Sequence, residues 1–194
     1  MASTNVFRDV LGDRYSGLPH AVRALHETAG RELAGEIHVA RGTNALAAFA
    51  GRIAGLPPSF RGPFRFESIP AVGSETWCRR VGGHEMRSTL RAEGGLLCER
   101  MGPIVFRFAL EPDASGLNWR LARVRWLGIP LPISWFAGVH AREFQHEDGR
   151  YGFSVEAALP LLGRIVRYDG QLVVDSPQRR VHDESGEDRM SERG

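Results

Sequence analysis

Hydrophobic and polar residues change their period near Phe64. Before this point apolar residues recur mostly at helical spacing, with one alternating run at Glu36–Arg41. After it they alternate with a period of two, which is typical of β-strands that have one buried face. The pattern predicts strands at residues 36–41, 64–69, 75–81, 84–91, 95–101, 104–110, 117–126, 139–146, 151–157 and 164–174. In the run 104–110 the alternate residues are all Ile, Phe or Leu, so one face of this strand is expected to lie in the core.

Tight turns separate these strands. Gly82-Gly83 suits a two-residue hairpin, because both glycines can take positive φ at little cost. Glu93-Gly94, Gly102-Pro103, Asp113–Gly116 and Asp148-Gly149 are further turn signals. Connections this short predict that sequential strands pair antiparallel. A meander of about nine or ten strands tends to curl or close, because closure removes exposed edges.

Three helices are predicted ahead of the long run of strands. They cover Asn5–Tyr15, a segment from Pro19 to a stop at Gly30, and Ala45–Ala54, where Thr43 or Asn44 can cap the N-terminus. The stripes at helical spacing are Val6, Phe7, Val10 and Leu11, then Val22, Leu25, His26 and Ala29, then Leu46, Phe49, Ala50 and Ile53. The third helix is rich in alanine, so it can approach a sheet closely.

The expected fold is α+β: a long antiparallel β-meander curled into a barrel or a half-barrel, with the N-terminal helices packed on it or inside it. The alternation does not reveal the shear of a barrel, so it does not distinguish a closed barrel from an open half-barrel. Residues 1–174 are expected to form one domain, as suits a chain of 194 residues. The tail 175–194 mixes charged residues, Ser and Gly without periodicity and is expected to be disordered.

Composition argues against several classes of partner. The formal net charge is only +2 and the arginines are interleaved with Glu and Asp, so no concentrated basic face for nucleic acid is expected. No run reaches the roughly 18 apolar residues of a transmembrane helix, and the N-terminus has no apolar leader. Cys78 and Cys98 have no zinc or CxxC spacing, which favours two buried thiols; a disulfide would require their strands to pair in register. The expected location is cytoplasmic.

One segment, Trp126–Phe136, is apolar except for Ser134 and carries no charge. Pro130 and Pro132 fix φ in it, so the segment is expected to be stiff. Two interpretations are open. The segment either folds back and caps the core, or forms an apolar rim at the mouth of a barrel for a lipid-like ligand, a partner or a membrane surface. The second interpretation makes Trp126, Leu131, Trp135 and Phe136 candidate ligand contacts.

Two adjacent charged pairs, Glu99-Arg100 and Arg142-Glu143, lie within predicted strands. Neighbours on a strand point to opposite faces, so one member of each pair faces inward. The alternation places Glu99 and Glu143 inward, with Arg142 on the other face. An inward carboxylate is costly unless paired, which predicts a cross-strand Arg–Glu contact. The alternative is a polar anchor at the bottom of a ligand cavity, with Arg142 or Glu143 orienting the polar head of the ligand.

Histidines and serines give no catalytic or metal signature. His26 lies on the apolar stripe of its helix, which favours a core histidine bonded to the backbone over a catalytic one. His140 and His146 are too far apart along their strand for a simple chelating pair, so no metal site is expected. Ser88, Ser134 and Ser154 lack a GxSxG context.

A set of motifs runs through almost the whole chain. They are Tyr15, Leu18-Pro19, Val22-Arg23, Leu25-His26, Arg41-Gly42, Gly55-Leu56-Pro57-Pro58, Trp77, Gly95-Leu96-Leu97, Glu99-Arg100, Gly102-Pro103, Gly128-Ile129-Pro130-Leu131-Pro132, Ala141-Arg142-Glu143, Gly149-Arg150, Pro160-Leu161-Leu162-Gly163 and Tyr168. Together they resemble a family of bacterial domains of unknown function, number 4166, found alone or fused C-terminal to saccharopine-dehydrogenase-like NAD(P)-binding domains. The resemblance covers residues 7–174. That family has no assigned activity, so the resemblance implies no catalytic residue.

Three functions remain open. The first is a binding module for a small apolar or lipid-like ligand, with contacts from the apolar segment and from Glu99, Arg142 and Glu143. The second is an enzyme acting on a hydrophobic substrate, with Glu99 or Glu143 as general acid–base. The third is an interaction module that docks on a dehydrogenase-like partner, which only the fused relatives imply. The chain has no GxGxxG after a strand, so the stand-alone form without a cofactor is expected.

Overall fold

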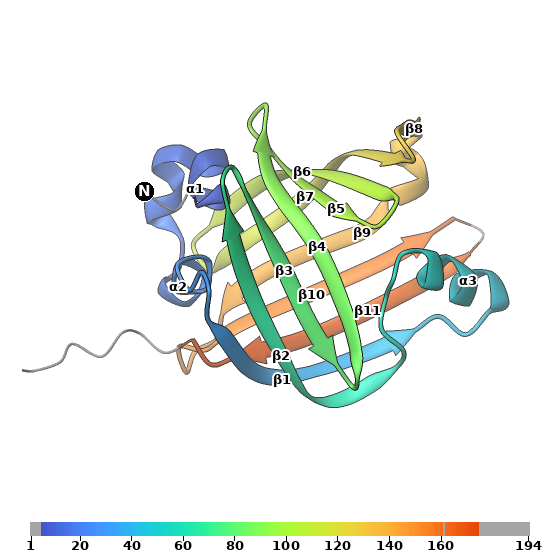
Figure 1. Cartoon of the computed structure of the whole chain (residues 1–194), viewed down its shortest axis with the longest axis horizontal. Helices are drawn as coiled ribbons and strands as arrows, with labels where there is room; N and C mark the ends of the chain where they lie inside the picture. Colours follow the sequence, from blue (N-terminus) through green and yellow to red (C-terminus); the bar gives the residue numbers. More distant parts are fainter. Residues whose placement is uncertain (1–4, 161, 175–194) are drawn as a thin grey trace, which may run out of the picture.

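Ten antiparallel strands close into a barrel in the computed structural model, which describes residues 5–160 and 162–174 (Figure 1). The barrel strands are β1 (Glu32–Arg41), β2 (Phe60–Ala71), β3 (Ser74–Val81), β4 (His84–Glu93), β5 (Leu96–Met101), β6 (Ile104–Asp113), β7 (Gly116–Trp126), β9 (Gly138–Gln145), β10 (Tyr151–Leu159) and β11 (Gly163–Leu172). Every strand expected from the alternation is present, and of the two alternatives left by the sequence the structure confirms the closed barrel. The expected tail, 175–194, lies outside the described residues.

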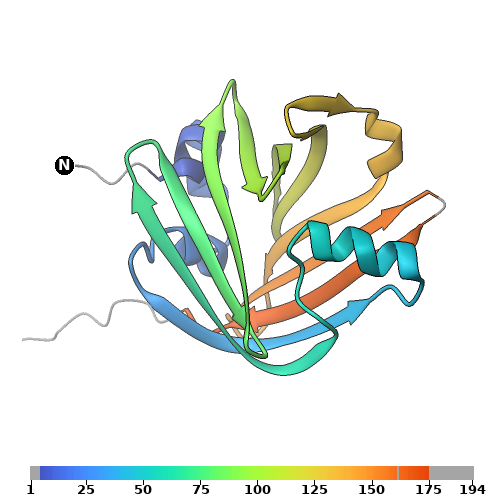
Figure 2. The same ribbon diagram turned by 45° about the vertical axis from the view of Figure 1, so that its right-hand side comes forward.

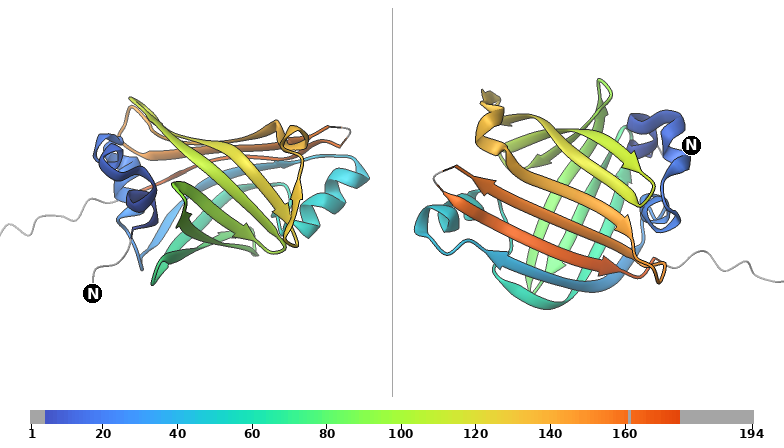
Figure 3. Two further views of the ribbon diagram at one scale, coloured as in Figure 1. Left: turned by 90° about the horizontal axis from the view of Figure 1, so that it is seen from above. Right: turned by 180° about the vertical axis from the view of Figure 1, so that it is seen from behind.

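The barrel closes through two features of strand pairing. β1 bonds both its neighbour β2 and the last strand β11, for example through Val39 opposite Tyr168. β7 divides its partners: its first half bonds β9, while its last residues bond β8 (Ile129–Leu131). The sequence did not predict β8, because proline and a three-residue length hide it within the apolar segment. It lies at the margin of the barrel, beyond β7 (Figure 3).

The N-terminal helices seal one end of the barrel. They are α1 (Val6–Leu11), the 3₁₀ helix η1 (Gly12–Gly17) and α2 (His20–His26). The predicted first helix ends early because Gly12 takes φ of 56°, which breaks the α-helical path. Phe7 of α1 and Val22 of α2 are fully buried on the inner side of these helices. Asn5 fastens it, since its side chain accepts from the Arg8 amide at 3.0 Å and donates to the His26 carbonyl at 2.9 Å.

Helix α3 (Ala45–Ile53) lies at the opposite end of the barrel, across from the N-terminal helices (Figure 2). Asn44 caps it, accepting from the Ala47 amide at 2.7 Å, as the sequence predicts. Only Ala47 and Gly51 are buried. The small residues therefore face the barrel, whereas the larger residues of the predicted stripe point outward.

Arg41, at the end of β1, holds α3 in place. Its guanidinium donates to the carbonyls of Ala48, Leu56 and Pro57 at 3.1–3.3 Å. A Cβ on Gly51 would lie 1.7 Å from the same guanidinium, so a larger residue there would displace the Arg41 side chain. Burial lowers the pKa of Arg41, with a further contribution from the nearby charge of Arg52.

We expect Arg41→Met to release α3 without opening the barrel, because three charge-assisted hydrogen bonds disappear together. The predicted loss is about 1–3 kcal/mol of unfolding free energy, with faster amide exchange confined to residues 45–56. Hydrogen exchange followed by mass spectrometry measures it. Arg52→Met is the matched control, since Arg52 is exposed on the same helix. Equal exchange in both variants would contradict the role of Arg41.

Candidate functional site

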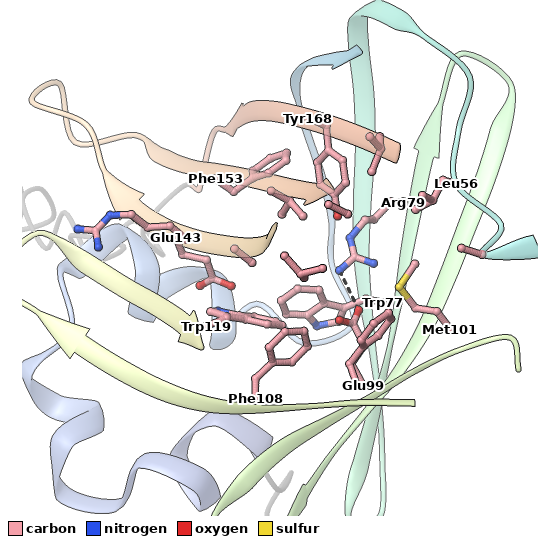
Figure 4. Close-up of a pocket in the computed structure, with 18 of the residues that line it drawn as sticks. Leu56, Trp77, Arg79, Glu99, Met101, Phe108, Trp119, Glu143, Phe153 and Tyr168 are labelled. Atoms are coloured by element: carbon pink, nitrogen blue, oxygen red, sulfur yellow. Dashed lines mark ion pairs between the residues drawn. The ribbon is translucent and has the colours of Figure 1, made fainter. Parts of the chain in front are cut away.

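The barrel interior holds a cavity of about 200 Å³ (Figure 4). At one end it reaches Leu25 of α2 and Tyr151 of β10, both fully buried. At the other end it reaches Ala50 of α3 and Phe136 of η2 (Ile133–Phe136), which are half-buried. The cavity is therefore sealed beneath the N-terminal helices and opens between α3 and η2. Most of its wall is aromatic or aliphatic: Phe64, Phe66, Trp77, Phe106, Phe108, Trp119, Phe153, Val155 and Val166.

One polar group in the wall is centred on Arg79 of β3. Its guanidinium lies 3.6 Å from the Glu99 carboxylate of β5 and donates to the Ser88 hydroxyl at 3.1 Å. It also stacks over the Trp77 indole, 4.8 Å from the ring centroid. Glu99 thus has the cross-strand arginine partner that its inward position predicts. β4 lies between β3 and β5, so the contact spans a strand.

Tyr168 of β11 faces this group across the cavity (Figure 4). Burial raises its pKa to about 12, with Arg79 lowering it and Glu99 raising it. The Tyr168 hydroxyl has no hydrogen-bond partner among residues 5–160 and 162–174. It is therefore a neutral donor and acceptor presented to the cavity.

A second polar group lies at the sealed end. His26 Nε2 is 2.8 Å from Glu143 Oε2, and both side chains are buried. Phe7 stacks on the imidazole at 3.6 Å between ring centroids. The expectation that His26 bonds the backbone is thus wrong: the helix register turns its ring toward β9, where an inward carboxylate needs a partner. Burial raises the pKa of Tyr151 well above its usual value, and the charge of Glu143 raises it further.

Beside this pair, a third carboxylate is buried without lining the cavity. Glu75 of β3 accepts from Trp77 Nε1 at 2.9 Å and from the Ser68 hydroxyl at 3.3 Å. Burial raises the pKa of Glu75, and the charge of His26 lowers it. Glu75 and the His26–Glu143 pair therefore form a polar layer between the N-terminal helices and the cavity.

Two buried side-chain nitrogens in or next to the cavity wall have no hydrogen-bond partner in the described part of the chain. They are Nε1 of Trp119 and Nδ1 of His26. Trp119 lines the cavity, and its indole points into it beside Glu143 (Figure 4). Trp119 Nε1 is thus a hydrogen-bond donor without an acceptor. Leaving a buried N–H unpaired costs about 1–3 kcal/mol.

The seven residues proposed from the sequence divide into three sets. Glu99, Glu143 and Phe136 line the cavity and are brought to one chamber from β5, β9 and η2. Arg142 borders the cavity, but its guanidinium lies on the outer face, bonded to Asp113, Asn118 and Ser115 at 2.6–3.0 Å. Trp126, Leu131 and Trp135 do not line the cavity.

The apolar segment Trp126–Phe136 does not cap the core. Trp126, Leu127, Ile129, Ile133 and Trp135 are all exposed. The interpretation that the segment folds back over the core is wrong, because these side chains are in solvent and β8 pairs with β7 at the margin of the sheet. Only Phe136 reaches the cavity.

Sequence reasoning missed four of the polar wall residues: Arg79, Trp119, Tyr151 and Tyr168. The signal was present for Arg79, because the alternation of β3 places Glu75, Trp77, Arg79 and Val81 on one face. A run of charged and aromatic residues on an inward face is typical of a lined cavity. No pattern could have joined His26 to Glu143, which lie 117 positions apart.

In the described residues no cluster of three or more His, Cys, Asp or Glu side chains is placed to hold a metal ion. Cys78 and Cys98 are buried free thiols, on strands separated by β4. No helix within 5–160 and 162–174 combines the length and the apolar character needed to cross a bilayer.

Comparison with known proteins identifies a family for this chain. No curated protein matches the sequence. One family model does, over residues 18–172, and it therefore spans the barrel, α2 and both polar groups of the cavity. The matched region is most of the chain, so this protein belongs to the family described as Domain of unknown function (DUF4166).

Proposed function

We propose that this protein binds a small, mostly apolar molecule with one neutral polar group inside the barrel. The observation that carries the proposal is the cavity that is sealed at one end, open at the other and lined by an unpaired indole N–H. Barrels of this size can enclose ligands, and ligand pockets combine apolar walls with a few fixed polar groups.

The size of the cavity limits the ligand. An apolar cavity of roughly 150 Å³ holds benzene. A cavity of about 200 Å³ therefore suits a single substituted ring or a short chain, not a molecule of two long chains. The walls contribute dispersion and apolar burial, worth about 25 cal/mol for each Å² removed from water.

The charges of the cavity favour a neutral polar group. Arg79 is matched by Glu99, and Glu143 is matched by His26. A ligand carboxylate would enter an apolar chamber beside the Glu143 carboxylate, where the Arg79 guanidinium is already matched by Glu99, at a large desolvation cost. A hydroxyl or carbonyl oxygen instead can accept from Trp119 Nε1, and the Tyr168 hydroxyl offers a second contact.

The test begins with native mass spectrometry of the purified full chain, followed by solvent extraction of anything bound. We then expect octanol to raise Tm in a concentration-dependent way, with octanoate binding at least about tenfold more weakly. Ala141→Phe, which fills the cavity beside Glu143, is expected to abolish the octanol shift. Calorimetry on the same samples measures the affinities.

Ala109→Phe is the matched control, because Ala109 faces outward on β6, between Phe108 and Leu110 of the inner face. It makes the same change in volume outside the cavity and is expected to leave octanol binding intact. Unaltered binding in Ala141→Phe, or no bound mass together with no response to octanol, would overturn the proposal.

A further inference from the structure

The mouth of the cavity is surrounded by exposed apolar side chains from two distant segments. On α3 these are Leu46, Phe49 and Ile53; on the β7–η2 segment they are Trp126, Leu127, Ile129, Ile133 and Trp135. Phe49 is 63% exposed, Leu127 67% and Trp135 54%. Because Ala50 of α3 and Phe136 of η2 line the same opening, both segments border it. Figure 1 shows α3 and β8 at the same end of the barrel, opposite α1 and α2.

The backbone of the rim adopts an unfavourable conformation at Leu127. Leu127 and Gly128 form the tip of the β7–β8 hairpin with φ of 48° and 84°. Leu127 is the only residue other than glycine with positive φ in the described part of the chain. That conformation is unfavourable for an L-residue with a bulky side chain, and Asn or Gly is the usual choice in such a turn. A leucine held there, with its side chain in solvent, indicates a contact made outside the fold.

The charges around the rim have one sign. Residues 45–53 and 123–136 contain Arg52, Arg123 and Arg125 and no acidic residue. All three arginines are exposed, and within the described residues none has a salt bridge. Arg125 lies opposite Pro130 of β8, directly beside the apolar tip. A protruding apolar surface flanked by unpaired arginines is complementary to a layer of anionic head groups above hydrocarbon.

We infer that this rim docks the barrel, mouth first, on the surface of an anionic lipid bilayer. Trp126 and Trp135 suit the head-group level, where amphipathic rings are enriched. Leu127 and Phe49 would enter the hydrocarbon boundary from opposite sides of the opening. This places the cavity mouth against the bilayer. The inference does not depend on the ligand proposed above.

The experiment is co-sedimentation of the full chain with vesicles of phosphatidylcholine, with or without phosphatidylserine. We expect binding to the vesicles that contain phosphatidylserine, and weaker binding as salt is raised. Phe49→Ser with Trp135→Ser is expected to lower the partition coefficient at least about tenfold. Arg125→Gln is expected to lower it about fivefold on anionic vesicles only, as for one arginine near a charged surface.

Matched controls exist at the other end of the barrel. Ile69→Ser with Val72→Ser removes two exposed apolar side chains near the β2–β3 turn and is expected to leave vesicle binding unchanged. Leu127→Asn is expected to change stability and vesicle binding in opposite directions. It relieves the positive φ and so raises resistance to urea, yet weakens vesicle binding.

The absence of binding to either vesicle type, or equal loss in the rim and control variants, overturns the inference. A dimer seen by analytical ultracentrifugation that dissociates in Phe49→Ser with Trp135→Ser also overturns it, because the rim then joins two copies of the chain. Ala141→Phe separates the two proposals: it removes ligand binding and is expected to leave vesicle binding intact.

Discussion

His26→Leu is expected to lower the free energy of unfolding by about 3–5 kcal/mol, a large share of the stability of a typical domain. The substitution leaves Glu143 buried at the sealed end of the cavity without the imidazole that lies 2.8 Å from it. The loss exceeds that of an ordinary core substitution of similar volume, because Glu143 is only 4% exposed and loses its histidine partner. Urea unfolding of the full chain measures it.

The double variant His26→Leu with Glu143→Leu separates the pair from simple packing. Replacing both partners with apolar residues removes the orphaned charge, so we expect at least about 2 kcal/mol to be recovered relative to His26→Leu alone. The exposed pair Arg164–Glu156 is the control, and breaking it should change stability by less than about 1 kcal/mol. A single variant that loses no more than this control would contradict the role assigned to the pair.

At alkaline pH the barrel is expected to lose stability steeply between about pH 10 and 12. All three tyrosines of the chain have raised pKa values: burial takes Tyr15 and Tyr168 to about 12 and Tyr151 well above its usual range. Each phenol therefore stays protonated in the native state while the unfolded chain begins to ionise near pH 10. Their stabilising contribution is complete below about pH 10 and is lost as pH rises toward 12.

The size of this effect follows from Tyr168. A pKa of about 12 in place of 10 corresponds to about 3 kcal/mol once both states are titrated. Native protein should show almost no tyrosinate absorbance up to about pH 11, followed by ionisation that coincides with loss of the near-ultraviolet circular dichroism. Tyr168→Phe should make unfolding less dependent on pH in this range. Gradual ionisation near pH 10 with the fold intact would contradict the burial of these phenols.

Local pattern was sufficient for the ten strands of the barrel and insufficient for β8 and for most of the site. Period-two alternation and the Gly82-Gly83 turn, with φ of 52° and 81°, determine where chain segments extend and reverse. Closure depends on β1 meeting β11, and no local signal encodes which distant edge a strand finds. Alternation also placed Glu99 and Glu143 inward, because that inference needs only neighbours on the same strand.

The helix α3 shows why hydrophobic spacing alone misleads. Its Leu46, Phe49 and Ile53 stripe has the spacing of a buried face, yet the structure buries Ala47 and Gly51. The guanidinium of Arg41 occupies the space beneath the helix, so only small residues fit toward the barrel. The face of α3 that packs on the barrel therefore depends on Arg41, a side chain of β1. The sequence of the helix alone does not carry this information.

Pairing of β1 with β11 also has a consequence for biosynthesis. During translation the strands β1 to β7 emerge in the order in which they pair, so hairpins can form as the chain lengthens. α2 cannot make its native contacts until β9 has been synthesised. The Ala21 amide donates to the Gln145 side chain at 2.8 Å, and His26 pairs with Glu143. Although α1 and α2 precede the strands in the chain, α2 is therefore expected to take its place only after β9 has been made.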